Sequence, residues 1–267
     1  MSPDLDTVTY TLAGCANRRT GWGVERDSFR CLAALAQFYD DSGWFHIGDR
    51  DLATHLYRTE RLARGIPLSA VTGEICRRLG VRARVLPASN DPLRTVIDTP
   101  DGRLSLQRYL VERRARPAVR GIRYVGAKRA RPAPGVVRAI REASAVIIAP
   151  SNPFLSIGPM LAIPGIRRAL EARPGRVAAI SPIVAGRAVS GPLAQLLRRY
   201  RLPVSPAGIA ACYRPFVDTI VLDRRDRSDT EALAALGCRS VVSDTLFLTP
   251  TRAVRVAHRL LEALALT

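Results

Sequence analysis

The sequence has almost no lysine, few aromatic residues and no motif typical of nucleic-acid binding. Lys128 is the only lysine among 41 basic residues, and the formal net charge is +18. Aromatic residues make up 6% of the chain, which leaves few side chains to stack on bases. The arginines are spread along the chain and do not form one basic tract. We therefore discount a nucleic-acid-binding protein, and we expect the positive charge to favour an anionic substrate.

Cysteines are also few, and long apolar runs are missing. The five cysteines are odd in number and have no C-x-x-C spacing, which predicts reduced cytosolic thiols and no disulfide framework or zinc site. No apolar run reaches the ~18 residues that a membrane-spanning helix needs. Residues 1–20 contain two aspartates and lack the basic-then-apolar order of a signal peptide. We therefore expect a cytoplasmic, globular protein without a membrane partner.

Helix and strand signals alternate from about residue 136 onward. Short apolar runs predict strands at 145–149, 177–180, 219–222 and 239–242, and the intervening segments predict helices that include 157–172 and 191–200. This alternation is typical of an α/β fold with a Rossmann-like, doubly wound, mainly parallel sheet, which binds ligands at the carboxyl ends of its strands. Short strands (85–87, 94–98, 103–111 and 122–125) predict a smaller α+β subdomain at 80–135, beside a core formed by 1–79 and 136–267.

The segment Ala149–Arg167, A-P-S-N-P-F-L-S-I-G-P-M-L-A-I-P-G-I-R, predicts an anion site. It follows a predicted strand and leads into a predicted helix, and the first amides of a helix have no intrahelical partners. Small residues of the loop could add side-chain donors or allow close approach to the backbone: Ser151, Asn152, Ser156 and Gly158. An ordinary loop with helix caps is the alternative interpretation.

A second loop of the same kind, Ser181–Pro192, follows the next predicted strand. Ser190 could cap a helix or donate to an oxygen, and Gly191 would allow a phosphate to approach closely. Neighbouring loops of a parallel sheet open on the same edge, so the two loops could straddle a diphosphate. Asp244, after the last predicted strand, could hold a base or a ribose hydroxyl, or could simply cap a turn.

Two acidic segments lie near the amino terminus. Asp4 and Asp6, two residues apart in S-P-D-L-D-T, could share a Mg²⁺ ion if they lie on a loop. An N-cap before a helix at 7–12 is the alternative. His46 and Asp49 belong to H-I-G-D-R-D, which is also typical of a turn and an acidic helix start. His55 follows one helical turn after an aspartate, and we expect it to brace that helix.

Five of these segments, in order, resemble the CofD-like family of 2-phospho-L-lactate transferases, which make coenzyme F-420. From the amino terminus they are S-P-D-L-D-T, G-D-R-D-L-A-T-H, S-N-P-x-x-S-I-G-P-x-L-x-x-P-G-I-R, S-P-I-V-A-G-R-A-V-S-G-P and S-D-T. The resemblance implies an enzyme that forms a phosphodiester. It would move a 2-phospholactyl or phosphoenolpyruvyl group from a guanosine-diphosphate-activated donor to the ribityl hydroxyl of the deazaflavin Fo, releasing GMP.

The resemblance also implies roles for individual residues and a cofactor, Mg²⁺. The catalytic residue would be Asp6, which would hold the metal with Asp4 as a weaker second ligand. The deazaflavin Fo would contact Asp6, His46 and Asp49. The donor nucleotide and its phosphates would contact Ser151, Asn152, Ser156, Gly158, Ser190, Gly191 and Asp244. The expected partners are therefore Fo and the activated donor, with a homodimer left open. A non-catalytic nucleotide-binding regulator of the same fold is the alternative.

In that family a strand with a Gly-rich loop, and a second strand with an acidic turn, ordinarily precede S-P-D-L-D-T. The printed sequence begins at this motif. Either the start is assigned too late, which we favour, or the chain is shortened. We expect a chain without these strands to fold poorly and to have weak activity, because the loss of a central strand exposes a sheet edge and apolar surface.

Overall fold

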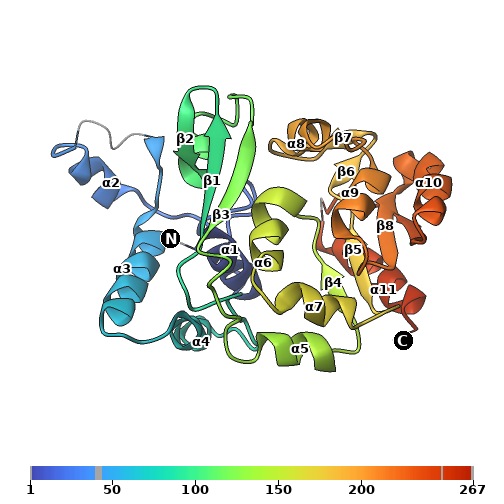
Figure 1. Cartoon of the computed structure of the whole chain (residues 1–267). Coiled ribbons are helices and arrows are strands. Elements are labelled where there is room, and N and C mark those ends of the chain that lie inside the picture. Colours follow the sequence, from blue (N-terminus) through green and yellow to red (C-terminus); the bar gives the residue numbers. More distant parts are fainter. Residues whose placement is uncertain (1, 40–43, 248, 266–267) are drawn as a thin grey trace. The chain divides into compact units, whose positions relative to one another are not determined.

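The computed structural model describes residues 2–39, 44–247 and 249–265 (Figure 1). The chain divides into two compact units. The first comprises Met1–Pro92 and Ala130–Val136, and the second comprises Leu93–Arg129 and Val137–Thr267. No helix in the described parts of the chain combines the length and the apolar character needed to cross a membrane. All five cysteines are free.

Helices form the framework of the first unit: α1 (Pro3–Leu12), α2 (Arg30–Leu35), α3 (Asp49–Ala63) and α4 (Leu68–Arg78). The helix expected at 7–12 begins earlier, because Pro3 fits the first helical position, where its missing N–H costs nothing. The described residues 81–92 contain no strand, so the strand expected at 85–87 is wrong. Instead, Ser89 forms an isolated bridge with Pro132.

A parallel sheet forms the centre of the second unit, with strand order β4-β5-β8-β9. Its strands are β4 (Val146–Ile148), β5 (Val177–Ile180), β8 (Thr219–Asp223) and β9 (Arg239–Ser243). Residues of β5 and β8 are buried along the whole length of both strands, as short apolar runs predict for a parallel sheet. Val256 and Leu260 of α11 (Pro250–Ala263) pack on Ala178 and Val221. The predicted α/β class with a parallel sheet is confirmed.

A second, antiparallel sheet has the order β2-β1-β3, with β1 (Arg94–Thr99), β2 (Gly102–Ser105) and β3 (Gly121–Val125). The strand expected at 103–111 ends at Ser105, and Arg108–Glu112 forms the helical turn η2. This turn buries the ring of Tyr109 in a cluster with Ile97 and Leu196. The burial of one large side chain therefore overrides the strand signal.

The remaining elements lie between these strands along the chain: α5 (Val136–Glu142), η3 (Pro153–Ile157), α6 (Gly158–Leu161), α7 (Ile166–Glu171), β6 (Ile183–Val184), β7 (Arg187–Ala188), α8 (Leu193–Arg199), α9 (Pro206–Tyr213), η4 (Arg224–Asp229) and α10 (Thr230–Ala235). The single helix expected at 157–172 is wrong. It is divided between α6 and α7 because Gly165, directly after Pro164, has φ +95°, which an α-helix does not accommodate.

Candidate functional site

Asp6 lies at the centre of a buried cluster in the first unit. It is 5% exposed, and Arg58 of α3 contacts both oxygens of its carboxylate: Nη1 donates to Oδ2 at 3.0 Å, and Nη2 donates to Oδ1. The Nε2 atom of His55 is 3.7 Å from Asp6 Oδ2 and 3.5 Å from Asp51 Oδ1. Tyr10 donates its hydroxyl to Asp51 Oδ1 at 2.9 Å. We call these five residues the α1–α3 cluster.

The spacing of three polar residues explains how α3 builds its half of this cluster. Asp51, His55 and Arg58 stand at positions i, i+4 and i+7, which lie on one face of a helix. The predicted position of His55 beside Asp51 is confirmed, but it bridges two carboxylates from different helices as well as bracing its own. Sequence reasoning missed Arg58. The signal was a polar stripe on the face that the helix buries.

Burial and charge oppose each other within the α1–α3 cluster. Burial raises the pKa of the Asp6 carboxyl above its ordinary value, and the Arg58 guanidinium and His55 offset only part of that rise. Burial would also raise the pKa of Asp51, but hydrogen bonds from His55 and Tyr10 outweigh it and lower that pKa. The two carboxylates therefore differ in acidity although they share one imidazole neighbour.

Asp4 does not belong to this cluster. The loop expected around Asp4 and Asp6 is wrong, because both residues lie in the first turn of α1. Residues two positions apart do not share a face of a helix, and Asp4 is exposed where Asp6 is buried. The groups that do come close are Asp6, Asp51 and His55, whose candidate ligand atoms all lie within 4.8 Å of one another. The structure thus brings Asp6 to a different carboxylate from the expected one.

Asp49 is the first residue of α3, as the helix-start interpretation of H-I-G-D-R-D predicts. Its carboxylate accepts three hydrogen bonds, from Ser28 Oγ at 2.6 Å and from the backbone N–H groups of Arg30 and Cys31. These bonds lower the pKa of Asp49 and cap the amino end of α2. His46 precedes α3 and is exposed. A contact of either residue with Fo stays a prediction.

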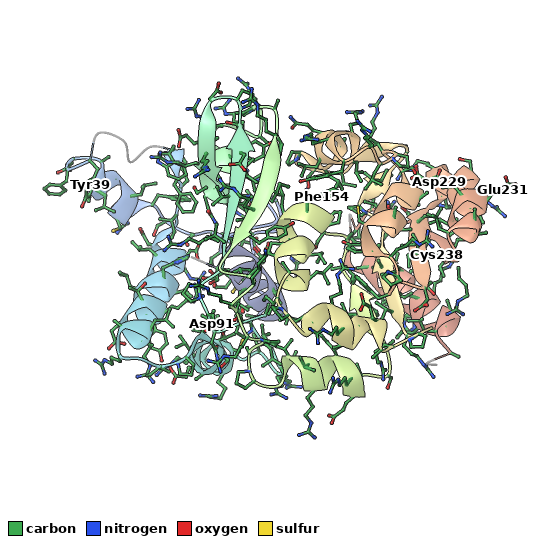
Figure 2. The ribbon with its side chains drawn as sticks, viewed as in Figure 1. Tyr39, Asp91, Phe154, Asp229, Glu231 and Cys238 are labelled. Atoms are coloured by element: carbon green, nitrogen blue, oxygen red, sulfur yellow. The ribbon has the colours of Figure 1, made fainter. Side chains whose placement is uncertain are left out.

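In the first predicted anion loop, which lies in the second unit, one side chain of the loop caps backbone amides. Asn152 Oδ1 accepts the backbone N–H groups of Phe154 (labelled in Figure 2) and Leu155, at 2.9 and 3.1 Å. Two amides that could have faced a ligand are therefore capped internally. Ser151 and Ser156, which flank this cap, are partly exposed. The loop follows β4 as predicted, and its phosphate contacts stay a prediction.

Gly158 meets a tyrosine hydroxyl at the position where a ligand was expected. A Cβ built on Gly158 would lie 2.2 Å from Tyr124 Oη and 2.9 Å from the carbonyl oxygen of Pro153. Tyr124 donates its hydroxyl to the carbonyl of Phe154 at 2.6 Å, which holds the ring in that place. Close packing against Tyr124 thus accounts for a glycine here.

We expect Gly158→Ala to lower the free energy of unfolding by about 1–3 kcal/mol, because the new methyl group overpacks this contact. Urea unfolding of the variant measures the loss. Tyr124→Phe removes the hydroxyl oxygen, so Gly158→Ala should cost less stability in a Tyr124→Phe background than in the wild type. An equal cost in the two backgrounds would show that the Tyr124 hydroxyl is not the obstacle.

The second predicted anion loop contains a hairpin that the sequence did not indicate. Strands β6 and β7 lie between β5 and α8, and Ser190 and Gly191 follow them as exposed residues. Gly191 has φ +65°, a conformation that favours glycine. Because β4 and β5 are parallel neighbours, the loops that follow them leave the same edge of the sheet. The parallel strand arrangement on which the two-loop prediction depends is confirmed, while contacts with a diphosphate stay a prediction.

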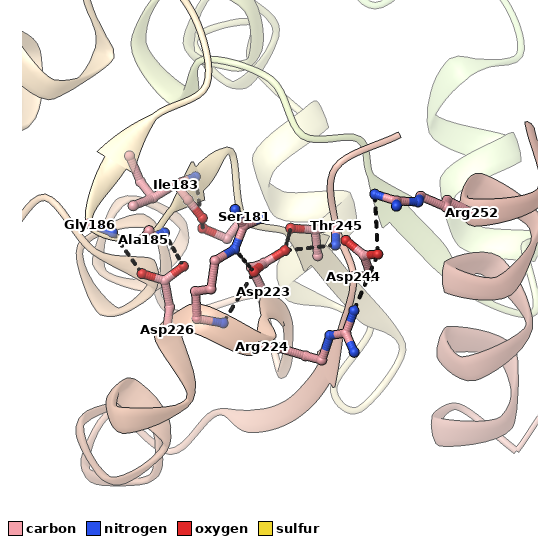
Figure 3. Close-up of polar contacts among 11 residues, drawn as sticks. Ser181, Ile183, Ala185, Gly186, Asp223, Arg224, Asp226, Asp244, Thr245 and Arg252 are labelled. Atoms are coloured by element: carbon pink, nitrogen blue, oxygen red, sulfur yellow. Dashed lines mark hydrogen bonds and ion pairs between the residues drawn. The ribbon is translucent and has the colours of Figure 1, made fainter. Parts of the chain in front are cut away.

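Figure 3 shows the polar contacts around the loops that follow β5, β8 and β9. Asp244 lies 3.4 Å from both Arg224 Nη2 and Arg252 Nη1. Asp223, at the end of β8, accepts the backbone N–H and the hydroxyl of Thr245, at 3.1 and 3.3 Å. Asp244 thus sits between two arginines, next to a residue that Asp223 holds in place. Sequence reasoning missed Asp223, whose signal is a carboxylate at the carboxyl end of a buried strand.

Acid is expected to remove a stabilising contribution of Asp223. Burial would raise its pKa, but hydrogen bonds from Arg225 and Thr245 lower it to about 2, from an ordinary value of 3.8. A depressed pKa stabilises the folded state above pH 3.8, by roughly 2 kcal/mol, and this contribution disappears as the pH falls from 3.8 to about 2. The unfolding free energies of the wild type and Asp223→Asn should therefore converge over that range. A difference that is independent of pH would contradict the expectation.

Comparisons with known proteins agree over most of the chain. A family model described as 2-phospho-L-lactate transferase CofD matches residues 1–256. The 2-phospho-L-lactate transferase of Methanosarcina mazei is 35% identical over 263 residues, 98% of this chain and 86% of the relative. The phosphoenolpyruvate transferase of Streptomyces griseus is 40% identical over 246 residues, 90% and 77% of the two chains. A solved Bacillus halodurans structure of the UPF0052 family has a TM-score of 0.59 at 18% identity, covers 95% of this chain and 81% of that chain, and shows the fold alone.

Proposed function

Because the chain belongs to the CofD family of 2-phospho-L-lactate transferases, we propose that it forms the phosphodiester bond of a coenzyme F-420 precursor. The family match over residues 1–256 is the observation that carries this proposal. The chain is a transferase with a role in F-420 biosynthesis. The proposed donor is guanosine diphosphate activated by 2-phospholactate or phosphoenolpyruvate, the proposed acceptor is the ribityl hydroxyl of Fo, and GMP is the leaving group.

We propose that Mg²⁺ is the cofactor and that Asp6 holds it. The donor set supports this choice, because Asp6 and Asp51 bring two carboxylates within 4.8 Å, and Mg²⁺ prefers a few carboxylate oxygens together with phosphate and water. Asp51 replaces Asp4 as the second ligand in this proposal. When bound, the metal neutralises charge on the transferring phosphoryl group. Arg58 fixes the orientation of the Asp6 carboxylate through two hydrogen bonds.

The substrates are assigned to residues of each unit separately. We assign Fo to Asp6, His46 and Asp49, where Asp6 is also our candidate for accepting the proton of the ribityl hydroxyl. We assign the donor to the loops at the carboxyl edge of the parallel sheet, the edge where doubly wound, Rossmann-like sheets bind ligands. Asn152 would contribute its Nδ2 donor there, since its Oδ1 is committed to two backbone amides. Ser190 and Gly191 are exposed and available to phosphate oxygens.

The test is direct turnover. The purified protein is incubated with Fo, Mg²⁺ and either the lactate-activated or the enolpyruvate-activated guanosine diphosphate, and mass spectrometry follows the coupled product and GMP. We expect one donor to yield both, and chelation of the metal to stop the reaction. Binding of the nucleotide without product from either donor, and without binding of Fo, would refute the transferase proposal and favour a nucleotide-binding regulator.

A further inference from the structure

Three aspartates at intervals of three residues, the last residue of β8 and two residues of η4, bind three different segments of the second unit. Asp223 accepts the N–H and the hydroxyl of Thr245 in the loop after β9. Asp226 accepts the N–H groups of Ala185 and Gly186 in the β6–β7 hairpin, both at 2.8 Å (Figure 3). Asp229 accepts the N–H of Ala207 at the start of α9, at 3.1 Å. One short segment thus fixes the backbone of three others.

Asp226 binds the hairpin through a buried carboxylate that makes two hydrogen bonds. Asp226 is 6% exposed, and each of its carboxylate oxygens accepts one backbone N–H, which makes both hydrogen bonds charge-assisted. Ala185 has φ +50° and Gly186 has φ +67°, the conformation of a two-residue type I′ turn. Alanine is unfavourable in this left-handed region. Asp226 therefore holds a turn that Ala185 disfavours.

Asp223 and Asp226 bind two segments that contain residues predicted to contact the donor nucleotide. The hairpin bound by Asp226 lies within Ser181–Pro192, which carries Ser190 and Gly191. Thr245, bound by Asp223, directly follows Asp244. Residues 223–226 have no predicted ligand contact of their own, but they bind two loops that do have one.

We propose that Asp226 and Asp223 are positioning residues for the donor site. They fix the loops after β5 and β9 so that the donor meets a preformed arrangement of backbone and side-chain groups, which lowers the ordering cost of binding. The inference rests on the proposed function, because it assigns these loops to the donor nucleotide. A merely structural role would lower stability without changing the affinity for one substrate selectively.

The test compares Asp226→Asn with Glu231→Gln, which alters an exposed carboxylate on α10 (Figure 2). In Asp226→Asn we expect the amides of Ala185 and Gly186 to exchange hydrogen at least about tenfold faster. We expect the KM for the donor to rise about tenfold, with the KM for Fo within about twofold of the wild type. Glu231→Gln should change neither quantity.

A rescue variant separates positioning from general damage. Adding Ala185→Gly to Asp226→Asn supplies a residue that adopts positive φ without steric cost, so the donor KM should return to within about threefold of the wild type. Asp223→Asn should also raise the donor KM selectively. Equal increases in the two KM values, or an unchanged donor KM with a loosened hairpin, would overturn the inference.

The same variants remain informative if the wild type transfers no group. The proposed function would then fail on its own, and calorimetric titration with GDP would judge the positioning role. GDP binding weakened about tenfold in Asp226→Asn and unchanged in Glu231→Gln would support it. Equal GDP affinity in the wild type and Asp226→Asn would refute it.

Discussion

Asp6→Asn is expected to lower kcat/KM for phosphodiester formation at least ~100-fold. Asn keeps the size of the side chain but removes the negative charge that we assign to Mg²⁺ and that Arg58 and His55 face. Product formation measured over a series of Mg²⁺ concentrations should show a weaker metal dependence as well as a lower rate.

Two further variants test whether the effect belongs to the carboxylates of the α1–α3 cluster. Asp51→Asn should also raise the Mg²⁺ concentration needed for half-maximal rate, because Asp51 offers the second carboxylate near Asp6. Asp4→Asn should lower kcat/KM less than about threefold, since that exposed carboxylate lies outside the α1–α3 cluster. Near-ultraviolet circular dichroism checks that each variant is folded. A folded Asp6→Asn protein with more than a tenth of the wild-type rate would rule out the assigned role.

Arg58→Ala should lower the free energy of unfolding by about 3–5 kcal/mol, because it leaves the buried carboxylate of Asp6 without its guanidinium partner. Arg58 itself is 5% exposed, so water does not replace the lost hydrogen bonds. Domains have total stabilities of about 5–15 kcal/mol, so this loss is large. Urea unfolding followed by circular dichroism measures it.

The carboxyl end of α3 offers a matched control. Arg64, the residue directly after α3, pairs with Glu60 at the surface, with 67% of the arginine side chain exposed. Arg64→Ala should therefore cost less than about 1 kcal/mol. Replacing both buried partners, as Asp6→Leu with Arg58→Met, should recover most of the stability because no unpaired charge remains. Losses of similar size in Arg58→Ala and Arg64→Ala would show that burial does not determine how much an ion pair contributes to the free energy of unfolding.

The parallel sheet could be predicted because its signals are local. Short apolar runs are typical of strands buried on both faces, and the runs at 177–180 and 219–222 correspond to β5 and β8. The position of a loop at one edge follows from strand direction alone. Ser151 and Ser190 could therefore be assigned to neighbouring loops without knowledge of any side-chain contact.

The side-chain environments could not be predicted in the same way. Asn152 and Gly158 fit an anion loop by residue type, but their neighbours show a helix cap and a contact with Tyr124. The run R-R-D-R-S-D is typical of a solvated turn, yet Asp226 is buried against the hairpin. The neighbours of Gly158 and Asp226 come from distant parts of the chain, whereas the Asn152 cap is local and uses the same residue type as an anion loop.

The sequence by itself determined the family, the parallel sheet and the edge at which its loops lie. These properties depend on residue order and on periodicities that neighbouring residues carry. Only the tertiary structure decided that Asp6 meets Arg58, 52 residues away, and that Asp51 and not Asp4 stands beside it. The physical reason is that the burial of a charge depends on which partner folding brings to it, and no local pattern specifies that partner.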